Sequence, residues 1–265
     1  MRTRLVAVAL MLAVPLVLAY PTGTGASQSQ ESQDEAVEPE PTEPLLFPVY
    51  LDGKYGFIDN TGNLVIDPQF DNAHNFFEGL ALVWIGHYET GKYGYIDDAG
   101  EFVINPQFDW AWDFSEGLAS VRIGGSGEFG EGKWGYIDKT GAFVVSPQFD
   151  WTLDFSEGLA VVRIGDYETG KYGYVDKTGK FAINPQFDGA HDFSEGLASV
   201  RIGGSEAGES GYIGKTGKFV INPQFDSARS FSKGLAEVRI RSGFLGEGRE
   251  WGYIDKTGKF VWGPS

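Results

Sequence analysis

The feature that most constrains the fold is a tetrapeptide that returns at a nearly fixed interval. Pro-Gln-Phe-Asp occurs five times, at 68–71, 106–109, 147–150, 185–188 and 223–226. Successive copies are 38, 41, 38 and 38 residues apart. A pair of an aromatic residue and glycine follows the same interval, at 55–56, 93–94, 134–135, 172–173 and 251–252, with one copy, Ser210-Gly211, lacking the aromatic residue. Such a period indicates an array of supersecondary units, none of which buries its apolar face alone.

Within one unit the apolar pattern has a period of two, which is typical of β-strands. Residues 118–123 (LASVRI) place Ala119, Val121 and Ile123 on one face. Residues 133–138 and 142–146 read as two further strands, joined by Asp-Lys-Thr-Gly. That junction has hairpin chemistry, because glycine accepts a positive φ and Asp or Thr hydrogen-bonds local amides. Each unit is therefore predicted to be a three-stranded meander followed by a longer connection.

Both ends of the array complete a unit. Residues 45–56 supply a first strand, and residues 249–262 supply a last hairpin. The predicted fold class is all-β, a tandem repeat array of six three-stranded meanders over 45–265. An open, twisted array is the favoured arrangement. A closed, propeller-like ring is the alternative, although propeller blades usually have four strands.

The sequence KWGYIDKTGAFVVSPQFD at 133–150, with FSEGLAVVRIG at 155–165, resembles the WG-repeat family, named for its Trp-Gly pair. The resemblance covers essentially all of 45–265. Several units depart from the pattern, with Tyr55, Tyr93 and Tyr172 in place of Trp, Ser210 in place of the aromatic residue, and Gly214 in place of the turn Asp. The resemblance implies an all-β interaction module and no catalytic residue. The losses at Ser210 and Gly214 predict that the fifth unit is the least stable.

The N-terminal residues read as an export signal and a linker. Arg2 and Arg4 precede an apolar run, Leu5 to Ala19, that is too short for a membrane span and suited to a signal peptide. We expect a signal peptide at 1–26, with an uncleaved anchor as the alternative. Residues 27–44 contain six acids and no base, which predicts an acidic, disordered linker. The protein is therefore expected in the periplasm, at the cell envelope or outside the cell.

Charge and cysteine content restrict the partners. The formal net charge is −16, and an acidic surface repels nucleic acid and anionic lipid. We expect no nucleic-acid partner and no stable membrane insertion after signal cleavage. The chain has no Cys, so its stability outside the cytoplasm must come from burial without disulfides. The oligomeric state is not predicted.

Repetition argues against catalysis, because a catalytic group needs one asymmetric environment. The Glu of the FSEG segments and the Asp of both the tetrapeptide and the turn return in unit after unit. Residues copied in this way are expected to cap turns and to satisfy backbone amides. His74, His87 and His191 are the only histidines, and no nucleophile elbow or P-loop is present. We therefore expect no catalytic, cofactor-binding or metal-binding residue, and no enzyme.

Two variable slots of the connection carry the remaining signal. The core Phe of the tetrapeptide never changes, but these slots hold Trp110, Trp112 and Trp151 in two adjacent units. Trp84 adds to this group, since it occupies a strand slot that Arg fills in later units. Clustered surface tryptophans often mark a binding patch. Packing of these indoles between units is the favoured interpretation, and a ligand-contacting patch is the alternative. The arginine row is expected to face outward and to pair with acids, with a recognition stripe as the alternative.

These observations predict an exported, non-enzymatic module that binds a protein partner. The alternative is a carbohydrate-binding module in which Trp110, Trp112 and Trp151 stack on extracellular glycans. A hydrolase that uses Asp109 or Asp113 with Glu116 is a third hypothesis, which the repetition argument disfavours.

Overall fold

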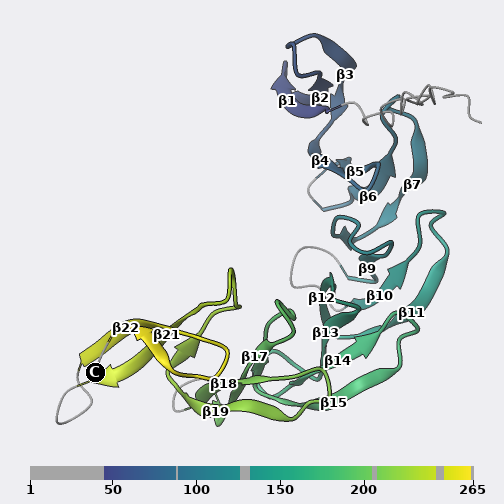
Figure 1. Cartoon of the computed structure of the whole chain (residues 1–265). Coiled ribbons are helices and arrows are strands. Elements are labelled where there is room, and N and C mark those ends of the chain that lie inside the picture. Colours follow the sequence, from purple (N-terminus) through teal and green to yellow (C-terminus); the bar gives the residue numbers. More distant parts are fainter. Residues whose placement is uncertain (1–44, 88, 126–131, 205–207, 243–247, 264–265) are drawn as a thin grey trace, which may run out of the picture. The chain divides into compact units, whose positions relative to one another are not determined.

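The computed structural model describes residues 45–87, 89–125, 132–204, 208–242 and 248–263. The predicted signal peptide and acidic linker lie outside these residues. Residues 43–265 form one compact unit. In its described part, six antiparallel sheets follow one another along the chain (Figure 1).

The first sheet has three strands, and the second has four. The first contains β1 (Phe47–Leu51), β2 (Lys54–Ile58) and β3 (Leu64–Phe70). The second contains β4 (Asn72–Phe77), β5 (Leu80–Ile85), β6 (Lys92–Ile96) and β7 (Phe102–Phe108). Sequential strands are hydrogen-bonded neighbours, so each sheet is a meander.

The remaining four sheets repeat the order of the second. The third contains β8 (Trp110–Ala111), β9 (Ala119–Ile123), β10 (Lys133–Ile137) and β11 (Phe143–Phe149). The fourth contains β12 (Trp151–Ser156), β13 (Leu159–Ile164), β14 (Lys171–Asp176) and β15 (Phe181–Phe187). The fifth contains β16 (Gly189–Ala190), β17 (Ala198–Ile202), β18 (Glu209–Ile213) and β19 (Phe219–Phe225). The sixth contains β20 (Ser227–Ala228), β21 (Ala236–Ser242), β22 (Gly248–Ile254) and β23 (Phe260–Trp262).

The all-β tandem array of six units is confirmed, and five of its sheets have one strand more than the meander predicted from sequence. The extra strand is the beginning of the connection, which pairs with the strand that follows it. In the fourth sheet a two-residue turn, Glu157–Gly158, joins β12 to β13. Both residues have positive φ, 53° and 83°, as a type I′ hairpin turn requires.

Two repeated residues are explained by the sheets. The tetrapeptide Pro lies on an outer strand, for example Pro147 on β11, where its missing N–H breaks no ladder. The Gly of the aromatic-Gly pair permits a close strand crossing. A Cβ on Gly135 would lie 2.4 Å from the carbonyl oxygen of Val145, so glycine is required there.

The apolar core is shared between successive sheets. One cluster joins Trp134 and Tyr136 of the third sheet to Phe155 and Val162 of the fourth. The Tyr136 side chain is fully buried, and its hydroxyl donates to the carbonyl oxygen of Leu153 at 2.8 Å. Equivalent Tyr hydroxyls cross to the next sheet at Tyr95, Tyr174 and Tyr212. Each unit is therefore completed by its neighbour, as expected for a solenoid-like array.

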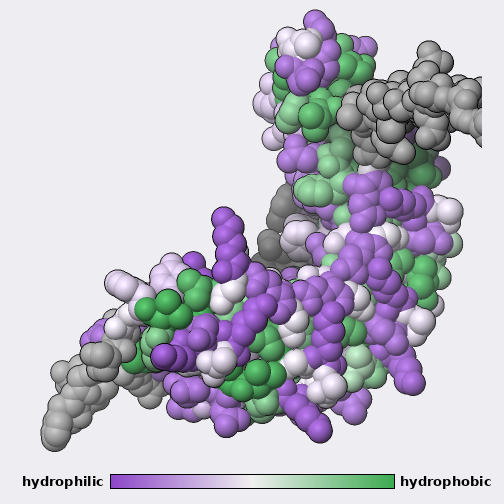
Figure 2. Space-filling view, in the orientation of Figure 1, coloured by the Kyte–Doolittle hydropathy of each residue, from purple (hydrophilic) through white to green (hydrophobic). Residues whose placement is uncertain are grey.

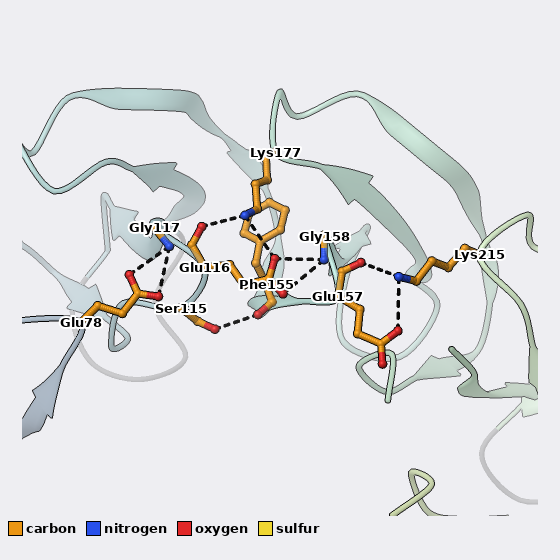
Figure 3. A network of polar contacts seen from close by, with 9 residues as sticks. All are labelled: Glu78, Ser115, Glu116, Gly117, Phe155, Glu157, Gly158, Lys177 and Lys215. Carbon is orange, nitrogen blue, oxygen red and sulfur yellow. Dashed lines mark hydrogen bonds and ion pairs between the residues drawn. The ribbon is translucent and has the colours of Figure 1, made fainter. Parts of the chain in front are cut away.

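Polar contacts also cross from sheet to sheet (Figure 3). The Glu116 carboxylate accepts from the backbone N–H of Gly158 at 3.0 Å and pairs with Lys177 at 3.2 Å. The Ser115 hydroxyl donates to the carbonyl oxygen of Phe155 at 2.8 Å. Glu78 and Glu157 repeat the Glu116 contacts one sheet earlier and one sheet later. These contacts confirm the structural reading of the repeated Glu.

The repeated Asp residues satisfy backbone amides within a sheet. The Asp138 carboxylate accepts from the N–H of Thr140 at 2.9 Å and of Ala142 at 3.1 Å, which closes the turn between β10 and β11. Asp109 of the tetrapeptide accepts from the N–H of Gly124 at 2.7 Å and pairs with Lys92. The expectation that these carboxylates cap turns is confirmed.

Candidate aromatic binding site

An aromatic–arginine–aromatic row crosses three strands of the third sheet. In the ladder, Arg122 on β9 lies opposite both Trp110 on β8 and Trp134 on β10. Its guanidinium carbon is 6.0 Å from the centroid of the Trp110 ring and 5.6 Å from that of Trp134. Only 2% of Arg122 is exposed. The guanidinium is therefore held between two indoles, where cation–π attraction is favourable.

The fourth sheet repeats this row with different residues. Arg163 on β13 lies opposite Trp151 on β12 and Tyr172 on β14. Its guanidinium carbon is 5.9 Å from the Tyr172 ring and 5.8 Å from the ring of Tyr167, which is 83% exposed. The Trp151 and Tyr172 centroids are 6.1 Å apart in an edge-to-face arrangement.

The other four-stranded sheets lack this combination in the same ladder positions. The second sheet has Asn72, Trp84 and Tyr93, with no arginine. The fifth has Gly189, Arg201 and Ser210, with no aromatic residue. The sixth has Ser227, Arg239 and Trp251. The two complete rows therefore lie only on the third and fourth sheets of the described residues.

The two rows open on one cavity of about 640 Å³. Six aromatic residues line it, namely Trp110, Trp112, Trp134, Trp151, Tyr167 and Tyr172. The volume lies within the roughly 300–1,000 Å³ range of ligand pockets, which are lined by aromatic groups and a few polar ones. Trp110, Trp112 and Trp151 are partly buried and pack against the core clusters. They therefore pack between units, as one of the two interpretations predicted, and they also line the cavity.

The cavity also holds charged groups. The Asp150 carboxylate pairs with Lys133 at 2.5 Å and accepts from the N–H of Gly165 at 2.8 Å. Burial raises the pKa of Asp150, but these two hydrogen bonds and the charges of Lys133 and Arg163 outweigh it and hold the pKa below its ordinary value. Hydrogen bonds from Thr169 likewise lower the pKa of Asp166. Both acids are therefore ionised and already satisfied at neutral pH.

The structure brings together three of the four predicted site residues. Trp110, Trp112 and Trp151 line the cavity, as expected from their equivalent places in adjacent units. Trp84 does not line it. Trp84 packs against Tyr93 at 6.5 Å, and Tyr93 in turn lies 5.5 Å from Trp110. Trp84 therefore extends the aromatic chain away from the cavity.

The expectation that the arginine row faces outward was wrong for Arg122, which is buried. Strand alternation does turn this side chain away from its own apolar face, but the neighbouring aromatic residues cover it. Trp134 and Tyr172 were also missed as site residues, because they occupy the repeated aromatic-Gly slot and resemble scaffold. The feature that places them at the site is their pairing with an arginine on the neighbouring strand. Strand register determines this pairing.

A second polar cluster lies outside this cavity. Asp113 accepts from the ring of His74 at 3.1 Å. Asp154 and Asp192 occupy the equivalent slot in the next two sheets, and each has a buried Oδ1 with no hydrogen-bond partner among the described residues. Burial, with the nearby charges of Asp113 and Asp192, raises the pKa of Asp154 to about 7. Among the described residues, no group of three or more His, Asp or Glu has the geometry of a metal site.

The family model described as the WG containing repeat matches residues 55–84, 93–126, 134–167, 172–205 and 211–242. These segments make up more than half of the chain. The chain belongs to the WG-repeat family. No curated protein matches it.

Three solved structures resemble the WG-repeat chain distantly. A puromycin hydrolase is 12% identical with a TM-score of 0.43, and the alignment covers 85% of this chain and 46% of the hydrolase. A quinonprotein alcohol dehydrogenase-like protein from Bacteroides thetaiotaomicron is 11% identical with a TM-score of 0.41, over 83% of this chain and 65% of the other. The tricorn protease is 11% identical with a TM-score of 0.35, over 83% and 26%. The WG-repeat chain therefore spans less than two thirds of each of these proteins.

The exposed surface of the array carries both hydrophilic and hydrophobic side chains. Figure 2 shows hydrophilic and hydrophobic residues interspersed on the visible face. Among the described residues, no helix has the length and apolar character needed to cross a membrane.

Proposed function

We propose that this chain is an exported, non-enzymatic module that binds carbohydrate in the aromatic cavity between its third and fourth sheets. The observation that carries the proposal is the convergence of Trp110, Trp112 and Trp151 on one concave space. Each indole is partly buried, so its orientation is fixed before a ligand arrives. Rigid, preorganised aromatic faces lower the entropy lost on binding.

Carbohydrate suits this site because a sugar has both apolar and polar surfaces. The C–H face of a pyranose ring stacks on an indole, while its hydroxyls hydrogen-bond to charged and backbone groups. The cavity supplies both kinds of partner, with six aromatic residues beside Lys133, Asp150 and Arg163. The apolar segment at 5–19 supports export, which would bring the module to extracellular glycans.

Absence of catalysis rests on how the carboxylates are used. Asp109 and Glu116, two of the acids considered for hydrolysis, accept backbone hydrogen bonds and pair with lysines. Their equivalents in other sheets make the same contacts. A group that serves the scaffold in each unit is poorly placed to act on one substrate.

Titration with a panel of soluble neutral and acidic oligosaccharides tests the proposal, with intrinsic Trp fluorescence as the readout. We expect at least one sugar to change the fluorescence of the full chain. We expect this binding to weaken at least tenfold in a Trp110/Trp112/Trp151→Ala variant. Trp84→Ala is the matched control, since Trp84 lies outside the cavity. Unchanged fluorescence across the panel, or equal affinity in both variants, would contradict the proposal.

A protein partner is the second candidate, and a row of exposed apolar side chains favours it. The last strand of each sheet except the fourth has an exposed Val at its second position, namely Val65, Val103, Val144, Val220 and Val261. A regular apolar row along an array is a surface on which a second protein could dock. Envelope extract passed over wild type and a Val103/Val144→Lys variant tests it. Identical retained proteins would count against this candidate.

A further inference from the structure

Arg163 gives the aromatic cavity a charged group that the scaffold does not neutralise. Its Nε is buried and has no hydrogen-bond partner among the described residues. Within the same residues, Arg163 makes no ion pair, although its charge is close enough to lower the pKa of Asp150 and of Asp166. Its contacts are with the rings of Tyr167 and Tyr172.

The acids beside Arg163 are already occupied. Asp150 pairs with Lys133 and accepts from Gly165, and Asp166 accepts from the backbone of Glu168 and from Thr169. The guanidinium carbon of Arg163 meanwhile lies over the rings of Tyr172 and Tyr167, 5.9 and 5.8 Å from their centroids. The planar guanidinium of an arginine can make a bidentate contact with a carboxylate.

The cavity lining differs in charge from the rest of the protein. Three cations, Arg122, Lys133 and Arg163, line it together with two anions, Asp150 and Asp166. The lining therefore has a formal charge of +1 in a chain whose net charge is −16. Among the described residues, the only arginines placed between aromatic residues on both neighbouring strands lie at this cavity.

We propose that the cavity selects a sugar ring bearing a carboxylate, with the ring stacked on Trp151 and the carboxylate bound by Arg163. This inference rests on the proposed carbohydrate-binding function and names its substrate class. An indole and a guanidinium that are neighbours on adjacent strands match a uronic acid, in which a carboxylate is attached to the edge of the ring. Since the net charge of the chain repels long polyanions, the ligand is a short or terminal acidic segment.

The test compares trigalacturonate with its fully methyl-esterified form, which has the same rings and no charge. Calorimetric titration of the full chain at pH 7 gives both affinities. We expect the acid to bind about 10- to 100-fold more tightly than the ester, which is the range for a charge-assisted hydrogen bond. In Arg163→Gln we expect this preference to disappear, so that the acid and the ester bind with equal affinity.

Arg239→Gln is the matched control, because Arg239 has the same strand slot in the sixth sheet and lies outside the cavity. We expect this variant to keep the full preference for the acid. Equal affinity of wild type for acid and ester would overturn the inference, and so would an acid preference that survives in Arg163→Gln. If a neutral sugar alone binds in a manner that depends on Trp110, Trp112 and Trp151, the proposed function stands and this inference fails. If neither galacturonate nor any other sugar binds, both fail.

Discussion

We predict that the buried Asp154 carboxylate, once ionised, destabilises the folded chain. Its Oδ1 is buried without a hydrogen-bond partner among the described residues, and the charges of Asp113 and Asp192 act on it from the neighbouring sheets. Burial is the largest cause of its raised pKa, which moves from 3.8 to about 7. The folded state therefore binds a proton that the unfolded state releases between these two values.

The sign follows from this difference in bound protons. Because the folded-state pKa is the higher one, stability from this group is full below about pH 4 and is lost as the pH rises through about 7. Each pKa unit corresponds to about 1.4 kcal/mol, so the ionised carboxylate costs up to about 4 kcal/mol at pH 8. Partial exposure and coupling to the two neighbouring acids reduce this figure, and we expect about 2–4 kcal/mol.

Asp154→Asn keeps the shape and removes the charge. We expect its urea midpoint to exceed that of wild type at pH 8 and to match it at about pH 3.5, below the unfolded-state pKa. The comparison at each pH cancels other groups, such as His74, whose pKa is raised by its hydrogen bond to Asp113, and His191, whose pKa is lowered by burial. Asp176→Asn in the same sheet is the control with the opposite sign, since hydrogen bonding to Thr178 lowers the pKa of Asp176. An Asp154→Asn variant that is no more stable than wild type at pH 8 would refute the reasoning.

Two further predictions concern glycine. Gly179→Ala should destabilise the array by about 1–2 kcal/mol more than Gly62→Ala. Both glycines have φ above +80°, but only at Gly179 would the new Cβ lie 2.7 Å from the Val145 side chain. Equal urea midpoints for the two variants would show that this contact between sheets is unimportant. Gly214→Asp should stabilise the fifth sheet by about 1 kcal/mol. The backbone turn is already formed, and the new Cβ would lie 3.7 Å from Val220, which is an ordinary contact. The new carboxylate would accept hydrogen bonds from turn amides, as the Asp138 carboxylate does in the third sheet. Hydrogen exchange checks this effect and the prediction that the fifth unit is the least protected, with Gly214→Ala as the control; equal protection across wild-type units would contradict that prediction.

Much of the fold followed from short-range chemistry. The period of the tetrapeptide predicted the number of units, and the Asp-x-Thr-Gly segments predicted their hairpins. The extra strand was not predictable from alternation, because Trp110–Ala111 is too short to show a period. The two-residue turn at Glu116–Gly117 was also missed, since Glu rarely adopts positive φ. Its 52° value accompanies hydrogen bonds and an ion pair with the next sheet, which are visible only in three dimensions.

The candidate site was predicted in part, for a related reason. Equivalent places in adjacent units were enough to bring Trp110, Trp112 and Trp151 together. The roles of Trp134 and Tyr172 depend on which strand slot lies opposite an arginine, and that register is set by the turns and bulges of each sheet. Arg122 was predicted to be exposed because the alternation of apolar and polar residues along a strand shows only which face of the sheet a side chain is on. It does not show that Trp110 and Trp134 cover the Arg122 side chain on that face.

The cross-strand rows are the part of the proposed binding site that differs from sheet to sheet. Three residues on three neighbouring strands define each row, and the tetrapeptide and turn residues that build the sheet are not among them. One row reads Trp–Arg–Trp, the next Trp–Arg–Tyr and the following one Gly–Arg–Ser on the same framework. Under the proposed function, exchange of these three side chains would change the ligand that a unit binds while the residues that build the sheet stay the same, so duplication of a unit would allow a new binding site without a new fold.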